Sequence, residues 1–427
     1  MRNIDQTGQF DAVIVGSGTC GSTIARELTR HKKKVLVLER GDDVPLKENF
    51  MTIASIADEV RLGEGGLAAT RAITAGGSTS LYFGVIIYPN LDTFRALGID
   101  LSNELSAVKK EIPIGAMPDE MLGAKGKRLR DAATSLGYSW VKRDVMVDLS
   151  KCTNGYSYEA KWKAKTYLQE AVTNGATLVT GARVHKILVA DGRAIGVEYR
   201  TKKRLAGSET RQAFGAKIIL AAGELASPKI LRDSGVKGVG DRGFFCPPGH
   251  ALYGLVPGMK GTEGFMGAMG CDYDQDLYIG DANMPKTMHR LMMLAKLKLR
   301  HLRSYAECIG IGVGAGDSLG GSFKEDGSFH KEYDKKILDR LRKGREVALN
   351  ILKGTGAKHI IDFGVMASGR VGGLVRINEH LDSNLESEFR NLHVCDGSVI
   401  PEDMQWPPTV TLVCLGKYLS KHLLSRI

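Results

Sequence analysis

A glycine-rich turn between an apolar strand and a helix constrains this chain more than any other feature. Residues 13–15 are Val-Ile-Val, and the pattern G-x-G-x-x-G follows at Gly16, Gly18 and Gly21. In such a turn the first glycine allows a sharp bend, the second lets backbone N–H groups approach a pyrophosphate, and the third lets the helix pack close to the sheet. Glu39 ends the next apolar strand, at the spacing of a carboxylate that binds an adenosine ribose. The sequence therefore predicts a dinucleotide site in a parallel α/β sheet.

The composition is that of a large, turn-rich α/β protein. The 427 residues include 52 glycines and are 43% hydrophobic, which is enough for about two lobes. The polar N-terminus and the lack of a long apolar stretch favour a cytoplasmic protein. Seven cysteines without a C-x-x-C pair indicate reduced thiols, and no metal site is expected. The net charge of +11 favours an anionic membrane surface or an acidic substrate over nucleic acid, because no platform of basic and aromatic residues accompanies it.

Later segments return to the first sheet, so the nucleotide-binding lobe is discontinuous in sequence. The expected elements are a helix over 164–172, a hairpin turned at Asp191-Gly192, a buried strand over 218–222, a strand and turn over 392–397 and a terminal helix over 408–424. The alternation of glycine with apolar residues over 310–316 predicts a strand under close backbone contact, not a second phosphate loop. A second nucleotide such as NADPH therefore has no evident site.

Three further segments carry a more specific pattern. They are Gly76-Gly77-Ser78-Thr79, residues 223–231 with the sequence Gly-Glu-Leu-Ala-Ser-Pro-Lys-Ile-Leu, and residues 391–401 followed by Pro408 and Thr411. With the glycine turn, they resemble the glucose-methanol-choline (GMC) family of FAD-dependent oxidoreductases over nearly the whole chain. The resemblance implies FAD as cofactor and a two-lobe α/β fold, with a Rossmann-like parallel sheet and β-meander beside an α+β substrate domain. We assign residues 1–90, 160–245 and 365–427 to a discontinuous FAD-binding domain, and residues 91–159 and 246–364 to a substrate or cap domain.

The expected cofactor-binding residues lie in these motifs and in the segment that leads into the Gly76 motif. They are Gly16, Ser17, Gly18, Thr19, Cys20, Gly21, Glu39, Arg40, Arg71, Ala75, Gly77, Ser78, Val184, Ala222, Gly223, Asp396, Gly397, Pro408 and Thr409. By the resemblance, Asp396 binds the ribityl chain and Val184 holds the adenine through its backbone. A helix beginning at Pro408 would direct its positive end toward the flavin N1–C2=O edge, where charge accumulates on reduction.

The chain departs from the family at the catalytic positions. Val365 stands where the family has its active-site histidine, and Pro407 stands where histidine or asparagine is usual. The base that removes the hydroxyl proton during alcohol oxidation is therefore missing. We name Tyr82, Gln405 and Trp406 as candidate catalytic residues from their motif positions, with shape and packing as the alternative role for each. The remaining histidines, His250 among them, have no partner at useful sequence spacing.

A basic amphipathic helix is predicted over 284–303, where apolar residues recur at helical spacing among lysines and arginines. One interpretation is a solvated helix that packs its apolar stripe on the second lobe. The other is an interfacial helix that dips into an anionic bilayer and admits a lipophilic substrate or a quinone. The second interpretation would make this cytoplasmic protein peripheral on the inner face of the membrane.

The leading hypothesis is an FAD-dependent oxidoreductase that moves hydride between the flavin N5 and a small or lipophilic organic substrate, in dehydrogenation of alcohol and ketone type or its reverse. A quinone or redox protein is the expected electron partner, in place of bound NAD(P). An alternative is reduction or formation of an activated, enone-like C=C bond, which needs a proton donor such as Tyr82. A second alternative is a flavin-binding partner protein without turnover, which the missing histidine permits.

Overall fold

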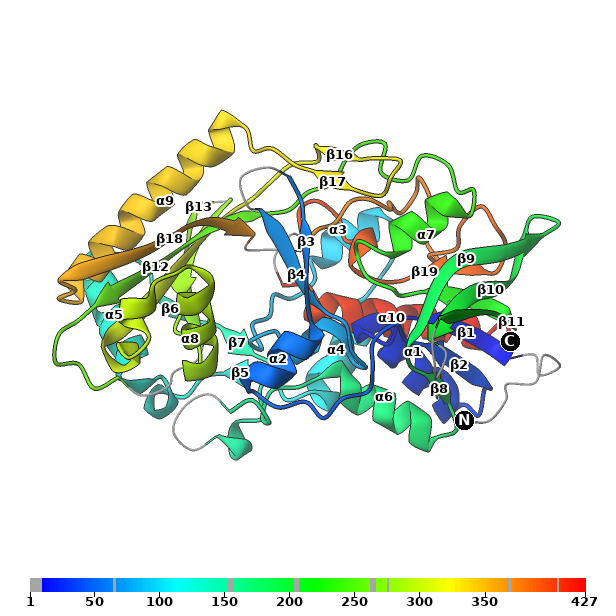
Figure 1. The fold of residues 1–427 in the computed structure, drawn as a ribbon, viewed down its shortest axis with the longest axis horizontal. Coiled ribbons are helices and arrows are strands. Elements are labelled where there is room, and N and C mark those ends of the chain that lie inside the picture. The colour runs from blue at the N-terminus through cyan, green and yellow to red at the C-terminus, as the bar shows by residue number, and fades with distance from the viewer. Residues whose placement is uncertain are drawn as a thin grey trace.

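The computed structural model describes residues 10–63, 67–152, 157–202, 207–261, 266–274, 276–367, 370–404 and 407–427. These residues form two lobes, each built on one large sheet (Figure 1). The candidate catalytic residues Gln405 and Trp406 lie outside the described residues. The two-lobe α/β architecture expected from the sequence is confirmed.

The sheet of the first lobe joins a parallel part to an antiparallel meander, in the strand order β8-β2-β1-β11-β10-β9, with β19 paired to β11. The long strand β11 makes the join, because its first half pairs antiparallel with β10 and its second half pairs parallel with β1 and β19. Asp191 and Gly192 both adopt positive φ in the β9–β10 turn, as the hairpin prediction requires. The strands are β1 (Phe10–Val15), β2 (Val35–Leu38), β8 (Thr177–Val179), β9 (Ala182–Ala190), β10 (Arg193–Lys202), β11 (Ser208–Leu220) and β19 (Leu392–Val394).

Helices cover the parallel part of this sheet. Helix α1 packs against both α6 and α10, and its residues Ile24 and Leu28 are fully buried. The Arg26 guanidinium of α1 pairs with Glu170 at 2.6 Å and with Glu111 at 2.8 Å, which ties three helices together. The helices of this lobe are α1 (Thr19–Arg30), α3 (Leu91–Ala96), α4 (Ser102–Glu111), α6 (Ala164–Thr173), α7 (Ser227–Asp233) and α10 (Thr409–Leu424).

Helices α3 and α4 contribute to the core of the first lobe, although the predicted boundaries place residues 91–159 with the second lobe. Phe94, Leu101 and Val108 are completely buried in the core that also contains the strands of the first sheet. Farther along the same segment, Leu129 and Trp140 join the core of the second lobe. The segment therefore divides between the two cores.

The second lobe is built on an antiparallel sheet in the order β18-β12-β15-β14-β13-β6. Figure 1 shows α9 and α8 on opposite sides of it. A Cβ on Gly310 would lie 2.2 Å from the carbonyl oxygen of Ala282, so the strand with close backbone contact predicted over 310–316 is confirmed. The elements are α5 (Gly123–Ser135), β6 (Val141–Lys142), β12 (Pro248–Leu255), β13 (Met269–Asp274), β14 (Leu277–Asp281), α8 (Lys286–Ala295), β15 (Cys308–Ala315), α9 (Lys335–Gly354) and β18 (His359–Ala367).

Small elements complete the fold, and the β3–β4 hairpin lies between the lobes (Figure 1). These elements are α2 (Phe50–Ile56), β3 (Ala57–Arg61), β4 (Ala68–Ala72), β5 (Gly115–Ala116), β7 (Asp144–Val145), β16 (Ser322–Phe323) and β17 (Phe329–His330). No helix within the described ranges is long and apolar enough to cross a membrane.

The predicted helix over 284–303 is shorter than expected, since α8 ends at Ala295. Leu297 then adopts the left-handed conformation, with φ of 54°. The N–H of Lys298 donates to the carbonyl of Met293 at 2.7 Å, which closes the end of the helix in a Schellman arrangement. The apolar periodicity continues past this point, but the helix does not.

Candidate functional site

The three glycines of the first turn have different structural roles. A Cβ on Gly16 would lie 2.3 Å from the carbonyl oxygen of Ala221, and a Cβ on Gly21 would lie 2.0 Å from that of Gly16. A Cβ on Gly18 would meet no atom of the described chain within 4 Å. The first and third glycines are therefore required by packing of the protein itself. The second one faces open space at the beginning of α1.

Glu39 ties the end of β2 to this turn. One of its carboxylate oxygens accepts from the backbone N–H of Ser17 at 3.0 Å and from the Ser17 hydroxyl at 2.6 Å, and the other accepts from the N–H of Gly41 at 2.7 Å. The side chain is buried at the wall of a cavity. The acidic residue predicted from its spacing is thus at the turn, and it also holds the turn in place.

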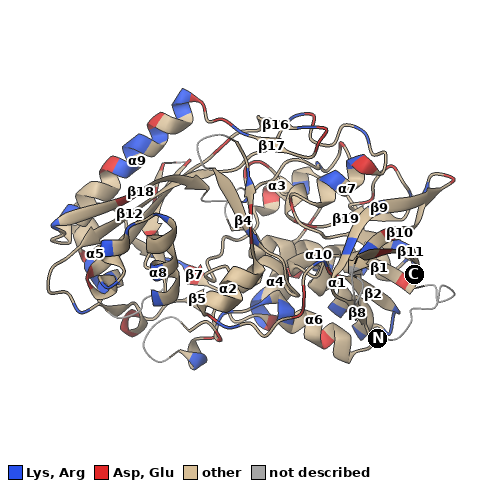
Figure 2. Ribbon diagram, in the orientation of Figure 1, with Lys and Arg blue, Asp and Glu red and all other residues tan. Residues whose placement is uncertain are grey.

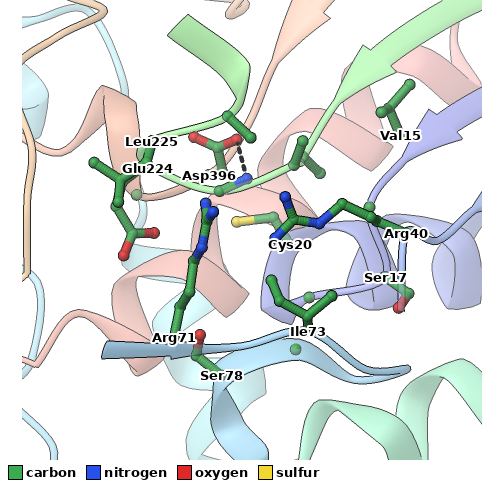
Figure 3. Close-up of a pocket in the computed structure, with 18 of the residues that line it drawn as sticks. Val15, Ser17, Cys20, Arg40, Arg71, Ile73, Ser78, Glu224, Leu225 and Asp396 are labelled. Atoms are coloured by element: carbon green, nitrogen blue, oxygen red, sulfur yellow. Dashed lines mark hydrogen bonds between the residues drawn. The ribbon is translucent and has the colours of Figure 1, made fainter. Parts of the chain in front are cut away.

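A cavity of about 350 Å³ opens at the carboxyl ends of β1 and β2. Figure 3 shows side chains from several segments converging on it. The cavity is lined by all the predicted cofactor-binding residues except Gly21 and Ala75. Gly21 packs behind the turn, and Ala75 is fully buried, with its N–H directed to the carbonyl of Asp42.

Arginines give the cavity a positive wall. Arg40 and Arg71 both reach the Asp58 carboxylate of β3, at 3.4 and 2.8 Å. In Figure 3 both side chains extend toward the space in front of Cys20. Burial and the nearby guanidinium of Arg71 lower the pKa of Arg40. Such a concentration of guanidinium groups suits an anionic ligand with phosphate oxygens.

Asp396 joins two segments that are far apart in sequence. Its carboxylate accepts from the N–H of Gly223 at 2.9 Å and from the Ser227 hydroxyl at 2.5 Å, while its second oxygen accepts from the N–H and hydroxyl of Ser398. Burial raises the pKa of Asp396, against the opposing effect of these hydrogen bonds. Parallel pairing of β11 with β19 brings the two segments together.

Sequence reasoning missed several residues of the cavity wall. They include Arg183 and His185 on β9, Glu224 and Lys229 at α7, and Arg370. Arg183 and His185 flank the predicted Val184, and Glu224 and Lys229 belong to the recognised 223–231 motif. Extending each motif to its neighbours would therefore have found four of them. Arg370 lies five residues after Val365, in a segment that the family resemblance also singled out.

Tyr82 lines the cavity, as its motif position suggested. Its hydroxyl donates to the carbonyl of Trp162 at 2.6 Å, and burial raises its pKa well above the usual value. The phenol is therefore protonated at neutral pH. The Tyr82 ring also packs against the core of the first lobe.

Two lysines lie behind Tyr82, of which Lys161 is buried and Lys163 is half-buried. The Lys161 ammonium donates to the carbonyl of Tyr82, and the Lys163 ammonium donates to the carbonyls of Tyr158 and Lys161. Burial and the charge of Lys163 lower the pKa of Lys161 to about 7, and burial lowers the pKa of Lys163 to about 8. Neither lysine belongs to a motif, so neither could be selected from the sequence.

Val365 stands at the exposed end of β18 and has a histidine across from it. Strand β12 pairs with β18 so that His250 lies opposite Val365. The imidazole Nε2 of His250 lies 2.6 Å from Asp362, whose carboxylate also binds Arg345. His250 thus has a partner 112 residues away, which sequence spacing did not reveal. It does not line the cavity.

The parallel sheet, the glycine turn and the cavity at its carboxyl end define a two-lobe dinucleotide-binding protein. The chain belongs to the GMC oxidoreductase family, whose sequence profile matches residues 10–242. This finding confirms the family expected from the sequence motifs.

Individual relatives agree with this membership. An uncharacterised GMC-type oxidoreductase of Mycobacterium tuberculosis is 29% identical over 252 residues, which cover 53% of this chain and 39% of that protein. This chain thus matches well under half the length of that relative. An uncharacterised protein of Methanocaldococcus jannaschii is 23% identical over 431 residues, which cover 97% of this chain and 100% of that protein.

Solved structures share the fold over nearly the whole length. Pyridoxine 4-oxidase from Mesorbium loti has a TM-score of 0.72 at 17% sequence identity. The superposition covers 98% of this chain and 100% of that one. A variant of Aspergillus oryzae formate oxidase, studied for FAD modification, has a TM-score of 0.67 at 14% identity, with 98% of both chains covered.

The cavity fits FAD, which is the cofactor of this protein. Gly18 and Gly223 both line the cavity, and a Cβ on either would meet no atom of the described chain, so the backbone is open to a ligand there. The acid at the end of β2 and the arginine wall match the ribose and pyrophosphate of a dinucleotide. We expect the residues of the cavity wall to hold it.

Loss of the Glu39 carboxylate is expected to weaken FAD binding by about 1.5–3 kcal/mol, the value of a charge-assisted hydrogen bond. Glu39→Ala also frees Ser17 and Gly41 of their shared acceptor, so the turn should loosen. Glu39→Gln should lie between the wild type and Glu39→Ala, because its amide oxygen can still accept. Titration of apoprotein with FAD, followed by flavin fluorescence, measures the change. Equal affinity of all three proteins would contradict the role of Glu39.

Proposed function

We propose that this protein is an FAD-dependent oxidoreductase that oxidises or reduces a small or lipophilic organic substrate of alcohol, ketone or related type. The observation that carries the proposal is the cavity, in which the dinucleotide turn, the Gly76 motif and Asp396 meet around one space. Family membership supports it. We propose a quinone or a redox protein as the electron partner.

FAD supplies a two-electron acceptor or donor when it is bound. The protein's own residues would hold it: Glu39 with the start of α1, and Asp396 with Gly223, line the cavity. Pro408 and Thr409 place the beginning of α10 at the cavity wall, where the positive end of the helix favours negative charge.

A second candidate is the reduction or formation of an activated C=C bond, and the state of Tyr82 favours it. Burial raises the pKa of this phenol, so its hydroxyl stays protonated at neutral pH and cannot act as a base; it can serve as a proton donor to substrate when it leaves the Trp162 carbonyl. Val365 and Pro407 provide no base either, so a substrate with an acidic C–H bond or a conjugated enone suits the site better than a plain alcohol.

Anaerobic mixing of the FAD-loaded protein with a substrate panel tests both candidates. The panel contains plain primary and secondary alcohols, ketones with acidic α-hydrogens, and, after photoreduction, enones. We expect plain alcohols to reduce the flavin at least about 100-fold more slowly than the activated substrates reduce or reoxidise it, since general-base assistance is worth about 10²–10⁴ in rate.

The other outcomes separate the alternatives. Fast oxidation of plain alcohols would contradict the missing base, and His250→Asn would then show whether His250 serves as the base. A flavin that reacts with no member of the panel, with no quinone analogue and with no oxygen would favour a flavin-binding partner protein without turnover.

A further inference from the structure

The end of α8 and the turn that follows it expose leucines. Leu297 is 81% exposed, Leu299 is 56% exposed and Leu294 is 42% exposed. Leu297 occupies the left-handed position that ends the helix, where glycine is the usual residue. Its side chain is therefore held out in solvent by the hydrogen bonds that close α8. We call residues 294–300 the basic tip.

The stretch that carries these leucines is basic and has no acidic residue. Residues 284–303 contain no aspartate or glutamate. None of the cations in this stretch forms an ion pair with a carboxylate among the described residues. Basic residues lie along α8 and the segment that follows it (Figure 2). The cations are Lys286, Arg290, Lys296, Lys298, Arg300 and Arg303.

We propose that the basic tip docks on an anionic lipid bilayer, with Leu297 and Leu299 inserted at the interface and the neighbouring cations on the headgroups. A bilayer interface offers negative charge beside an apolar layer, and it satisfies both kinds of side chain at once. Nucleic acid would pair with the cations but would leave the leucines in water. The proposal does not depend on the reaction that the protein catalyses.

The remainder of α8 explains why the tip projects. His289 and Met293 are buried, and the His289 ring stacks on Tyr253 of β12 with centroids 5.4 Å apart. These contacts anchor the helix on the second lobe. The tip can therefore engage a surface without unfolding of the helix that carries it.

Flotation of the full-length, FAD-loaded protein with vesicles tests the proposal. Vesicles of phosphatidylglycerol and phosphatidylcholine in equal parts should bind the wild type at low salt, whereas vesicles of phosphatidylcholine alone should not. The double variant Leu297→Asn/Leu299→Gln should weaken binding by about tenfold or more, because insertion of the apolar side chains is lost. Asparagine tolerates the left-handed conformation, so this variant should keep its melting temperature.

Charge is tested in the same assay with matched controls. Lys296→Ser/Lys298→Ser should weaken binding by about tenfold, and higher salt should have the same effect. Leu338→Gln and Lys335→Ser/Lys336→Ser alter exposed residues of the same types on α9, and they should bind as the wild type does.

The following results would overturn the proposal. One is no flotation with anionic vesicles at low salt. Another is vesicle binding that the leucine variant does not weaken. A further one is lysine-dependent binding of a nucleic acid oligomer by a protein that does not bind vesicles. Weakened vesicle binding by the α9 control variants would also overturn it, because the basic face of α9 or overall charge would then account for attachment.

Discussion

The Gly18→Val variant is expected to fold normally and to lose its FAD. A Cβ at position 18 would meet no atom of the described chain within 4 Å, and the backbone there has φ of −68°, which any residue adopts. The valine would instead occupy cavity space at the beginning of α1, where the pyrophosphate is expected. We expect FAD affinity to fall by about 1,000-fold, or about 4 kcal/mol.

The measurement is the flavin content of purified protein together with titration of apoprotein. Gly115→Val is the matched control, because Gly115 also has open space around its Cβ position and lies outside the cavity wall. The control should retain FAD. A full flavin complement in Gly18→Val protein with an unchanged melting temperature would refute the placement of the cofactor.

Removal of the Lys161 charge is expected to change how stability depends on pH. The unfolded lysine keeps an ordinary pKa near 10.5, whereas burial lowers the pKa to about 7 in the folded protein. Below pH 7 both states carry the proton, so the full cost of the buried ammonium is present. Between pH 7 and pH 10 the unfolded state binds more protons, so the stability of the wild type should rise with pH through this window.

The size of this effect is at most about 5 kcal/mol, because one pKa unit corresponds to about 1.4 kcal/mol. Lys161→Met should therefore be more stable than the wild type below pH 7, and the difference should shrink toward pH 10. Denaturant titrations from pH 6 to pH 10 measure it. Lys335→Met, on the exposed face of α9, is the control. Parallel pH curves for wild type and Lys161→Met would show that Lys161 is not held as a buried charge.

The parts of the fold that follow local rules could be predicted from the sequence. The turn at Gly16 and the hairpin at Asp191-Gly192 depend on backbone conformations that few residues adopt, so their residue types are informative. The end of α8 is different, because Leu297 takes a left-handed conformation that its residue type does not signal. Periodicity alone therefore extended the predicted helix beyond Ala295.

The features that could not be predicted from the sequence depend on long-range packing. Helices α3 and α4 were expected in the second lobe because their segment lacks a strand pattern, yet Phe94 and Val108 pack into the first core. The partnership of His250 with Asp362 arises from strand pairing, which a single sequence does not reveal. The cavity wall was predicted largely from its motifs, whereas the burial of Lys161 depends on the aromatic rings around it.

The pairing of β11 with β19 has a consequence for the order of synthesis on the ribosome. Residues 221–391 are translated between these adjacent strands, which takes on the order of 10–30 s at typical elongation rates. Throughout this interval the last residues of β11 present an unpaired edge, and Asp396 and α10 do not yet exist. All strands of the second sheet are complete by Ala367, so the nascent chain can finish the later lobe before it closes the earlier one. Because Asp396 and the start of α10 line the cavity, we expect capture of FAD to be a late event, and a stalled chain would expose a sheet edge open to mispairing.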